Sequence, residues 1–248
     1  MNDGNVDAVV LAAGRAARMH GQDKTLALLG GVPVLVWCLR TFDRSDVIRE
    51  VVVTASRENR DDVVEAVRAA ELVKVSEVVL GGASRAESVL NALESLADND
   101  STFVAIHDGA RPFVTTDIIS RGVQAARIYG ASVAAVPSVD TVKLVDGTGL
   151  VSKTIPRKQV WLAQTPQVGR LDILLEAHRR NRNRLATFTD DVALLEHEGI
   201  PVHVFESDPR NVKITCPNDL FEARERVAFL ADRAVPSAQN VHTDILEA

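Results

Sequence analysis

Apolar runs of strand length alternate with longer amphipathic segments through the first half of the chain, and this alternation constrains the fold more than any other feature. The apolar runs are rich in valine and lack a polar–apolar alternation, which is typical of strands buried on both faces of a sheet. The expected strands are Val6–Leu11, Val51–Thr54, Val78–Leu80, Phe103–Ile106 and Ser132–Val136. The expected helices are Pro33–Phe42, Asn59–Ala70, Arg85–Leu96 and Thr116–Tyr129. Strand–helix alternation of this kind predicts an α/β fold with a mostly parallel sheet.

The alternation breaks after Val136. Residues Ser138–Leu162 predict a β-hairpin, because Asp146-Gly147 is a strong turn signal. A lone hairpin is not stable in water, so we expect this arm to pack against a partner subunit; a plain surface hairpin is the alternative. The alternation then resumes, with expected helices at Leu171–Asn183, Asp190–Glu198 and Pro217–Arg233 and expected strands at Val202–Glu206 and Val212–Thr215.

Length and composition bound the class of protein. The 248 residues fit a single domain, which we place at residues 1–232, followed by a polar, flexible tail at residues 233–248. A net charge of −6 lacks the basic excess of a sequence-independent nucleic-acid binder. The two cysteines, Cys38 and Cys216, are far apart and suit a reducing compartment. Without a signal-peptide pattern or an apolar run of about 18 residues, we expect a cytoplasmic protein with no membrane partner.

The first motif, Leu11–Met19, follows the first expected strand and is rich in small residues. Small residues let the backbone approach a ligand, and the N–H groups of such a turn can hold phosphate oxygens. Arg18 and Lys24 follow at short spacing and supply the positive charge that a triphosphate requires. An ordinary strand–helix turn with solvated basic residues is the alternative. The motif lacks both the dinucleotide-binding G-x-G-x-x-G and the G-K-[ST] of a P-loop, which disfavours a nicotinamide enzyme and a P-loop kinase.

The second motif, Gly81–Ser88, again joins a short strand to a helix. Its two glycines permit close contact with a flat base, whose edge backbone groups and Ser88 can bind. A tight turn with a serine helix cap is an equally weighted alternative.

The third motif is the string IHDGARP, in which a strand delivers His107 and Asp108 into a turn closed by Arg111 and a proline. Asp108 can orient a substrate hydroxyl or a cation carried by the nucleotide, and Arg111 can bind a carboxylate or phosphate through forked hydrogen bonds. We expect His107 to fix the loop rather than to titrate in catalysis. An Asp–Arg pair that merely pins the turn is the alternative.

Four dispersed polar strings complete the pattern: DTVK at 140–143, QTPQ at 164–167, TDD at 189–191 and NVKIT at 211–215. The TDD string predicts a helix N-cap. Together with Arg157, the hydroxyl and cationic groups of the other strings suit a sugar phosphate.

These strings occur in the order LAAGRAARM…K, GGASRAESV, IHDGARP, DTVK, PRKQVWLAQTPQ, TDD and NVKIT and cover about residues 6–230. In this combination the chain resembles the 2-C-methyl-D-erythritol 4-phosphate cytidylyltransferases of the non-mevalonate isoprenoid pathway. The resemblance implies a Rossmann-like, three-layer α/β fold of the type A nucleotidyltransferases, with a protruding β-arm. It also implies transfer of CMP from CTP to a polyol phosphate, Mg²⁺ bound mainly through the CTP phosphates, and a homodimer formed through the arm.

The resemblance also implies roles for individual residues. The expected nucleotide contacts are Ala12, Ala13, Gly14, Gly82, Arg85, Ser88 and Asp108. The expected acceptor contacts are Arg111, Thr141, Arg157, Thr165 and Lys213, with Thr141 and Arg157 reaching the neighbouring subunit's site. The expected catalytic cations are Arg18, Lys24 and Lys213. No side chain is assigned to the metal, although Asp108 is a candidate.

Three residues depart from the family pattern. Ala16 stands where relatives usually have glycine, Asp23 stands where they usually have proline, and Ala83 replaces a residue that is often polar. An acidic Asp23 beside Lys24 can neutralise part of the charge meant for phosphate. Two other functions stay open: a ribitol 5-phosphate cytidylyltransferase and a nucleotide-binding protein without catalysis.

Overall fold

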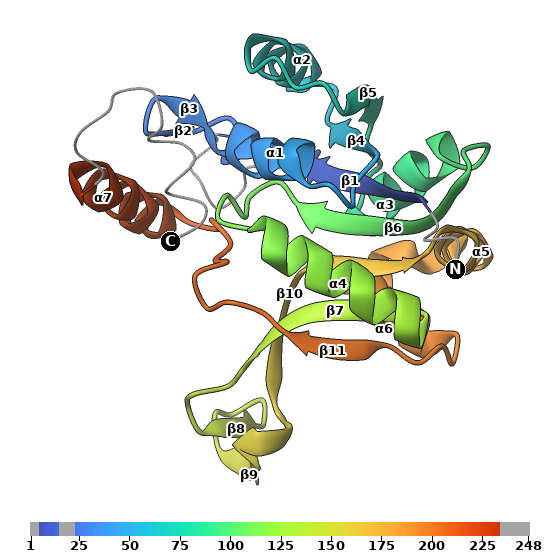
Figure 1. The fold of residues 1–248 in the computed structure, drawn as a ribbon. Coiled ribbons are helices and arrows are strands. Elements are labelled where there is room, and N and C mark those ends of the chain that lie inside the picture. The colour runs from blue at the N-terminus through green and yellow to red at the C-terminus, as the bar shows by residue number, and fades with distance from the viewer. Residues whose placement is uncertain (1–4, 15–22, 234–248) are drawn as a thin grey trace.

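A seven-stranded sheet forms the centre of the protein (Figure 1). The computed structural model describes residues 5–14 and 23–233; the predicted tail therefore lies almost entirely outside the described residues. In order across the sheet, the strands are β11 (His203–Glu206), β7 (Ala131–Pro137), β10 (Trp161–Arg170), β6 (Ser101–Asp108), β1 (Asn5–Ala12), β4 (Glu50–Ala55) and β5 (Val75–Leu80). Only β10 runs antiparallel to its neighbours in this sheet, so the prediction of a mostly parallel sheet is confirmed.

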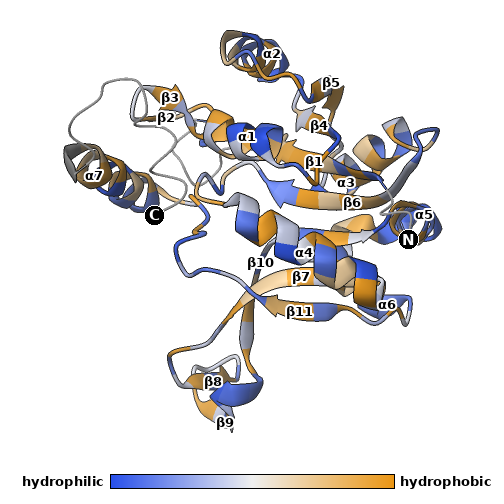
Figure 2. Cartoon of the chain, viewed as in Figure 1, coloured by the Kyte–Doolittle hydropathy of each residue, from blue (hydrophilic) through white to orange (hydrophobic). Residues whose placement is uncertain are grey.

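Helices cover both faces of the sheet, which gives the three-layer α/β fold. One face carries α1 (Val34–Arg44), α2 (Arg60–Ala69) and α4 (Thr116–Tyr129). The other carries α3 (Arg85–Ser95), α5 (Leu171–Arg180), α6 (Asp191–His197) and a 3₁₀ segment, η2 (Arg182–Thr187). The strand pleat divides the core, since Ala8 and Val10 of β1 pack on the first face and Val9 packs on the second. In Figure 2, β1 and β7 are largely hydrophobic, whereas α1 and α4 carry both hydrophilic and hydrophobic residues.

A smaller apolar cluster attaches α7 (Pro217–Arg233) to the body of the protein. A short hairpin of β2 (Leu28–Leu29) and β3 (Val32–Pro33), absent from the predictions, lies against α7. The indole of Trp37 is buried in this cluster and donates to the carbonyl of Leu29 at 2.9 Å. This hydrogen bond therefore connects α1 to the β2–β3 hairpin, against which α7 packs.

Two predictions on secondary structure are wrong. Residues Val212–Thr215 form no strand; the segment instead makes a single backbone bond from Ile214 N–H to the carbonyl of Ala110 at 2.8 Å. Conversely, the structure contains a central strand, β10, that the sequence did not predict. Its middle contains Gln164, Thr165, Pro166 and Gln167, and polar residues and proline argue against a central strand. The pairing with β7 is irregular between Ala163 and Gln167, which lets the proline fit.

The expected arm is confirmed. Strands β8 (Val142–Val145) and β9 (Val151–Ile155) form their own two-stranded sheet, and a 3₁₀ turn, η1 (Arg157–Gln159), leads back to β10. The arm projects away from the end of β7 and β10 (Figure 1). At its tip, the Asp146 carboxylate accepts from Thr148 N–H at 2.9 Å and from Leu150 N–H at 3.1 Å, which closes the predicted turn.

No helix within residues 5–14 and 23–233 combines the length and the apolar composition needed to cross a bilayer.

The start of β1 holds an ion pair between a buried carboxylate and an exposed guanidinium, at the end of the strand opposite Ala12. The Asp7 carboxylate is inaccessible to solvent and accepts two bonds from Arg49, at 3.0 Å from Nε and 2.7 Å from Nη2. Replacing Arg49 with methionine should cost about 2 kcal/mol of stability, because the buried carboxylate would keep only the bond from Asn99 Nδ2 at 3.5 Å. Urea denaturation measures this loss. The double variant Asp7→Asn/Arg49→Met should recover part of it; a double variant as unstable as Arg49→Met would contradict the assignment.

Candidate active site

A cleft of about 550 Å³ opens at the carboxyl ends of β1, β4, β5 and β6. This is the edge of an open α/β sheet at which ligands bind, and the volume suits a small molecule. The charged side chains in its lining are Lys24, Arg57, Glu58, Arg85, Asp108 and Lys213. Cations therefore outnumber carboxylates in the lining, as an anionic ligand requires.

The turn after β1 forms one wall of the cleft, to which Ala13 and Gly14 contribute. Ala12 is fully buried: its N–H donates to Thr54 Oγ1 at 3.3 Å, and its carbonyl accepts from Asn59 Nδ2 at 2.9 Å. Ala12 thus holds the turn in place, and its contact with a nucleotide stays a prediction. Arg18 and Ala16 lie outside the described residues.

The carboxylate of Asp23 has a structural role. It accepts from the N–H and hydroxyl of Thr25 at 2.8 and 2.7 Å, and from Asn59 Nδ2 at 2.5 Å. Asn59 in turn holds the carbonyl of Ala12. The acidic residue at this position therefore links the segment that carries Lys24 to the end of β1.

The loop before α3 forms a second wall. Ser84 caps the helix by accepting from Glu87 N–H at 3.1 Å, and the Glu87 carboxylate accepts from Ala83 N–H at 2.8 Å. Ser88 Oγ accepts from Gly82 N–H at 3.0 Å and donates to the carbonyl of Ser84 at 2.9 Å. The serine cap is thus confirmed, and the binding of a base by this loop stays a prediction.

Close packing requires glycine at two positions of this loop. A Cβ on Gly81 would collide with the Cβ of Ala13, and a Cβ on Gly82 would collide with the Cβ of Glu87. Gly81 therefore brings the loop before α3 into contact with the turn after β1, Gly82 lets the loop pack against the first turn of α3, and the first two sequence motifs share one cleft.

Three cations converge on the carboxylate of Asp108 at the end of β6. Lys213 Nζ lies 2.8 Å and Arg111 Nε 3.5 Å from its Oδ2, while Arg85 Nε lies 3.5 Å from its Oδ1. Burial alone raises the pKa of the Asp108 carboxyl, but the charges of Arg85, Lys213 and Arg111 hold it well below its usual range. The expected convergence of Arg111 and Lys213 on one site is therefore confirmed.

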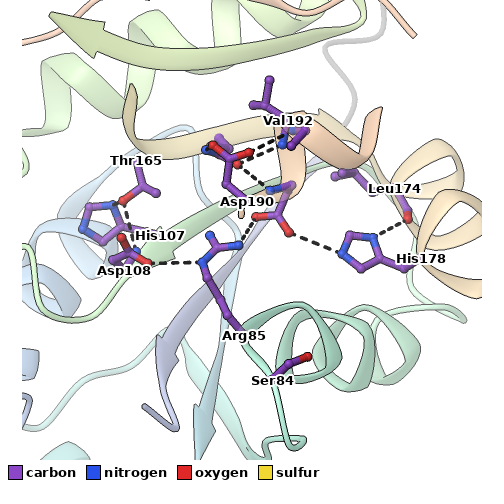
Figure 3. Close-up of polar contacts among 12 residues, drawn as sticks. Ser84, Arg85, His107, Asp108, Thr165, Leu174, His178, Asp190 and Val192 are labelled. Carbon is purple, nitrogen blue, oxygen red and sulfur yellow. Dashed lines mark hydrogen bonds and ion pairs between the residues drawn. The ribbon is translucent and has the colours of Figure 1, made fainter. Parts of the chain in front are cut away.

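A buried hydrogen-bond chain fixes the loop that carries Asp108. Thr165 Oγ1 accepts from Asp108 N–H at 3.1 Å and lies 3.0 Å from His107 Nδ1, and His107 Nε2 lies 3.2 Å from the carbonyl of Arg111 (Figure 3). Because a carbonyl only accepts, the imidazole proton lies on Nε2, and Thr165 donates its hydroxyl hydrogen to Nδ1. This confirms that His107 fixes the loop. Thr165 is 3% exposed, so its acceptor contact stays a prediction.

Lys213 reaches the cleft from a segment that the loop after β6 holds in place. Arg111 Nη1 donates to the carbonyl of Asn211 at 2.8 Å. The amide of Asn211 donates to the Thr165 carbonyl at 2.8 Å and to Gln164 Oε1 at 3.0 Å. Much of the Arg111 side chain is thereby engaged within the protein. The sequence predicted a strand here and a role for Lys213, but it gave no role to Asn211, which places the lysine.

Five predicted site residues among those described do not line the cleft: Ala12, Arg111 and Thr165, which lie within the body of the protein, and two residues of the arm. Thr141 and Arg157 are exposed on the arm, where Arg157 Nη1 donates to the carbonyl of Val139 at 3.1 Å. Neither residue contributes to the cleft lining. Sequence reasoning conversely did not select Arg57 and Glu58, which line the cleft after β4 and occur in no motif.

Within residues 5–14 and 23–233, no three His, Cys, Asp or Glu side chains cluster in a way that could hold an ion. Three cations surround the carboxylate of Asp108, and its contact with a metal stays a prediction. The cleft thus defines an α/β protein whose cationic site suits a polyanionic ligand.

Comparison with known proteins narrows this class. The family model described as IspD, 2-C-methyl-D-erythritol 4-phosphate cytidylyltransferase, matches residues 6–228. The chain belongs to this family of cytidylyltransferases. A curated relative of that name from Dehalococcoides mccartyi (strain CBDB1) is 40% identical over 218 residues, which are 88% of this chain and 94% of the relative. A relative of the same name from Geobacillus kaustophilus is 40% identical over 230 residues, 92% of this chain and 98% of the relative.

Solved structures agree with the family. The crystal structure of 4-diphosphocytidyl-2C-methyl-D-erythritol synthase from Anaerococcus prevotii superimposes with a TM-score of 0.81 at 26% identity, covering 92% of this chain and 97% of that one. The 2-C-methyl-D-erythritol 4-phosphate cytidylyltransferase of Thermus thermophilus gives a TM-score of 0.69 at 31% identity, covering 89% and 98%. The expected three-layer nucleotidyltransferase fold is therefore confirmed.

The burial of His107 predicts how stability depends on pH. Burial lowers the pKa of His107 to about 4, with further lowering by Arg111 and Lys213, although the Arg111 carbonyl and Asp108 partly oppose it. The unfolded chain binds this proton near pH 6.5, so protons favour unfolding between about pH 6.5 and pH 4. As the pH is lowered through this window, the free energy of unfolding should fall by about 1.4 kcal/mol per pH unit, roughly 3 kcal/mol in all.

Urea denaturation at several pH values measures this slope. The His107→Gln variant keeps an amide donor and acceptor but has no titrating ring, so its slope between pH 6.5 and 5 should be shallower. Equal slopes in the variant and the wild type would show that His107 does not contribute.

Proposed function

We propose that this chain transfers CMP from CTP to 2-C-methyl-D-erythritol 4-phosphate, giving 4-diphosphocytidyl-2-C-methyl-D-erythritol and pyrophosphate in isoprenoid biosynthesis. The carrying observation is the cluster of Lys213, Arg111 and Arg85 around Asp108 at the floor of the cleft, in a chain of this family. The curated relatives are named for the same reaction.

The chemistry requires positioning and positive charge. A phosphate oxygen of the acceptor forms a bond to the α-phosphorus of CTP, while the bond from this phosphorus to the oxygen bridging to the β-phosphorus breaks. Pyrophosphate leaves with that electron pair. The acceptor phosphate is already an anion at neutral pH, so it needs no general base. Lys213 and Lys24, together with Arg18 as predicted, reduce the repulsion between two polyanions and stabilise charge on the five-coordinate phosphorus.

The loop before α3 suits a cytosine base. The hydrogen of the Ser88 hydroxyl is already donated to Ser84, so a ligand meets only an acceptor there. The exocyclic amine of cytosine is a donor, whereas uracil presents a carbonyl at the same position. We therefore expect Ser88 and the backbone of Gly82 to favour CTP over UTP.

We expect Mg²⁺ to be held by the phosphates of CTP, because the described side chains offer no three-ligand site. The ion neutralises phosphate charge when it is bound. Chelation with EDTA should abolish pyrophosphate release, and excess Mg²⁺ should restore it.

The arm supports a homodimer in which each arm completes the neighbouring site. It exposes apolar side chains, with Val139 78%, Leu150 68% and Val151 59% accessible, and a two-stranded sheet of this kind needs a packing partner. Thr141 and Arg157 lie on this arm and away from the chain's own cleft. A second copy can bring them to the acceptor.

A cytoplasmic location is also proposed. Both cysteines are free thiols, and burial raises the pKa of Cys38 far above its usual range, which makes it an unreactive core residue. Free thiols suit a reducing compartment.

A pyrophosphate-release assay tests the reaction directly. Purified protein with CTP and Mg²⁺ should release pyrophosphate with 2-C-methyl-D-erythritol 4-phosphate and much less with ribitol 5-phosphate. Preference for ribitol 5-phosphate would establish the alternative acceptor. CTP binding without turnover on any polyol phosphate would instead indicate a non-catalytic protein.

Lys213→Ala should reduce turnover on the order of 10²–10³, as the loss of one preorganised charge-stabilising donor does. Arg68→Ala is the matched control, because it removes one cation from the exposed surface of α2. Near wild-type turnover of Lys213→Ala would exclude a catalytic role for this lysine.

Complementation tests the shared site. Arg157→Ala should weaken acceptor affinity more than CTP affinity, and equal losses would place Arg157 elsewhere. When Lys213→Ala and Arg157→Ala chains are co-expressed, hybrid dimers contain one intact site, and random pairing should give about a quarter of wild-type activity. A mixture that shows only the average of its two parents would mean that the arm does not act in the neighbouring cleft.

A further inference from the structure

A buried carboxylate at the start of α6 lies behind the cleft. Asp191 is 2% exposed, and its Oδ2 accepts from Arg85 Nη1 at 2.8 Å. Its Oδ1 lies 3.3 Å from Nε2 of His178, so side chains of α3 and α5 approach it from two sides (Figure 3). Gln167 Oε1 accepts the N–H groups of Asp191 at 3.0 Å and of Val192 at 3.3 Å. The helix start is thereby clamped to β10, and the carboxylate has a fixed position.

The ring of His178 packs against this carboxylate. The ring is fully buried, and its Nδ1 lies 2.8 Å from the carbonyl of Leu174, so Nδ1 carries a hydrogen and donates it to that carbonyl. Its Nε2 lies 3.3 Å from Asp191 Oδ1, and neither atom has a hydrogen-bond partner among the described residues. Arg85 therefore provides the directed side-chain hydrogen bond to the Asp191 carboxylate.

Several other charged groups surround this site. Asp191 on α6 is the carboxylate that faces the ring, and Arg85 on α3 binds the opposite oxygen of that carboxylate. Glu94 on α3 pairs with Arg179 at 3.7 Å on the outer part of the helix pair. Burial raises the pKa of Asp191, but Arg85 and His178 outweigh it, so this carboxyl stays ionised.

Arg85 connects this buried pair to the cleft. Its Nη1 binds Asp191 at 2.8 Å, and its Nε lies 3.5 Å from Asp108, which also holds Lys213 at 2.8 Å. The side chains form a continuous series from the interior to the cleft: His178, Asp191, Arg85, Asp108 and Lys213. Arg85 thus pairs with both carboxylates of this series, Asp191 and Asp108. Removing the charge of Asp191 would therefore change how Arg85 and Lys213 pair with Asp108.

The geometry points to Asp191 as a positioning residue for Arg85, which through Asp108 sets the place of Lys213 in the cleft. If Asp191 were neutral, Arg85 would bind Asp108 alone and compete there with Lys213. The kinetic consequence rests on the proposed cytidylyl transfer, whereas the effect on CTP affinity does not.

Asp191→Asn is the test variant. Its amide oxygen can accept from Arg85 and its NH₂ group can donate to His178 Nε2, so the packing is kept while the charge is removed.

The positioning role is tested with Asp190→Asn as the matched control. Asp190 caps α6 by accepting from Ala193 N–H at 2.9 Å and also accepts from Gln167 Nε2 at 3.0 Å. Asparagine caps helices equally well, so Asp190→Asn removes the same charge one residue away and leaves the Arg85 ion pair intact. Asp191→Asn should lower kcat about 10- to 100-fold, as a small misplacement of a catalytic group does, and should change the KM for CTP much less.

Two results separate the possible failures. Equal kcat values for Asp191→Asn and Asp190→Asn, with cooperative unfolding of both, would overturn the positioning role. If the wild type turned over no acceptor, the proposed function would fail, but calorimetric CTP affinity would still test the network. In that case Asp191→Asn should bind CTP less tightly than Asp190→Asn does, and equal affinities would overturn the proposal.

Discussion

The ionised carboxylate of Asp108 is the group on which the site depends. Burial would neutralise it, and only the approach of Lys213, Arg111 and Arg85 keeps it charged. These cations come from three separate parts of the chain: α3, the loop after β6, and the segment after β11. The ion cluster can therefore form only when all three have folded, and in return it holds the cationic groups at one edge of the sheet.

Buried polar side chains build the loops around this carboxylate. Thr165, His107 and Asn211 are almost inaccessible to solvent, yet each is hydrogen-bonded to the backbone or to another of these groups. A buried polar group without a partner would be costly, so this set of bonds admits few alternative loop conformations. Several residues whose chemistry suits a sugar phosphate thus support the site from behind it.

The protein divides into a body that contains the cleft and an arm that does not reach it. The body has a continuous core on both faces of the sheet, while the arm is a two-stranded sheet with exposed apolar residues. This division is the reason for the proposed dimer, because Thr141 and Arg157 lie on the arm and do not line the chain's own cleft.

The sequence alone determined most of the strand–helix alternation, the arm and most of the strings that line the cleft, because hydrophobic period, turn residues and glycine positions are local properties. Only the tertiary structure determined which distant polar residues are partners. It placed polar β10 in the middle of the sheet, where Gln164 and Gln167 find hydrogen-bond partners in distant segments. It also joined Asp191 to Arg85 across 106 positions of the chain. A buried charge or amide is stable only beside its partner, and that partner is defined by the fold rather than by its neighbours in sequence.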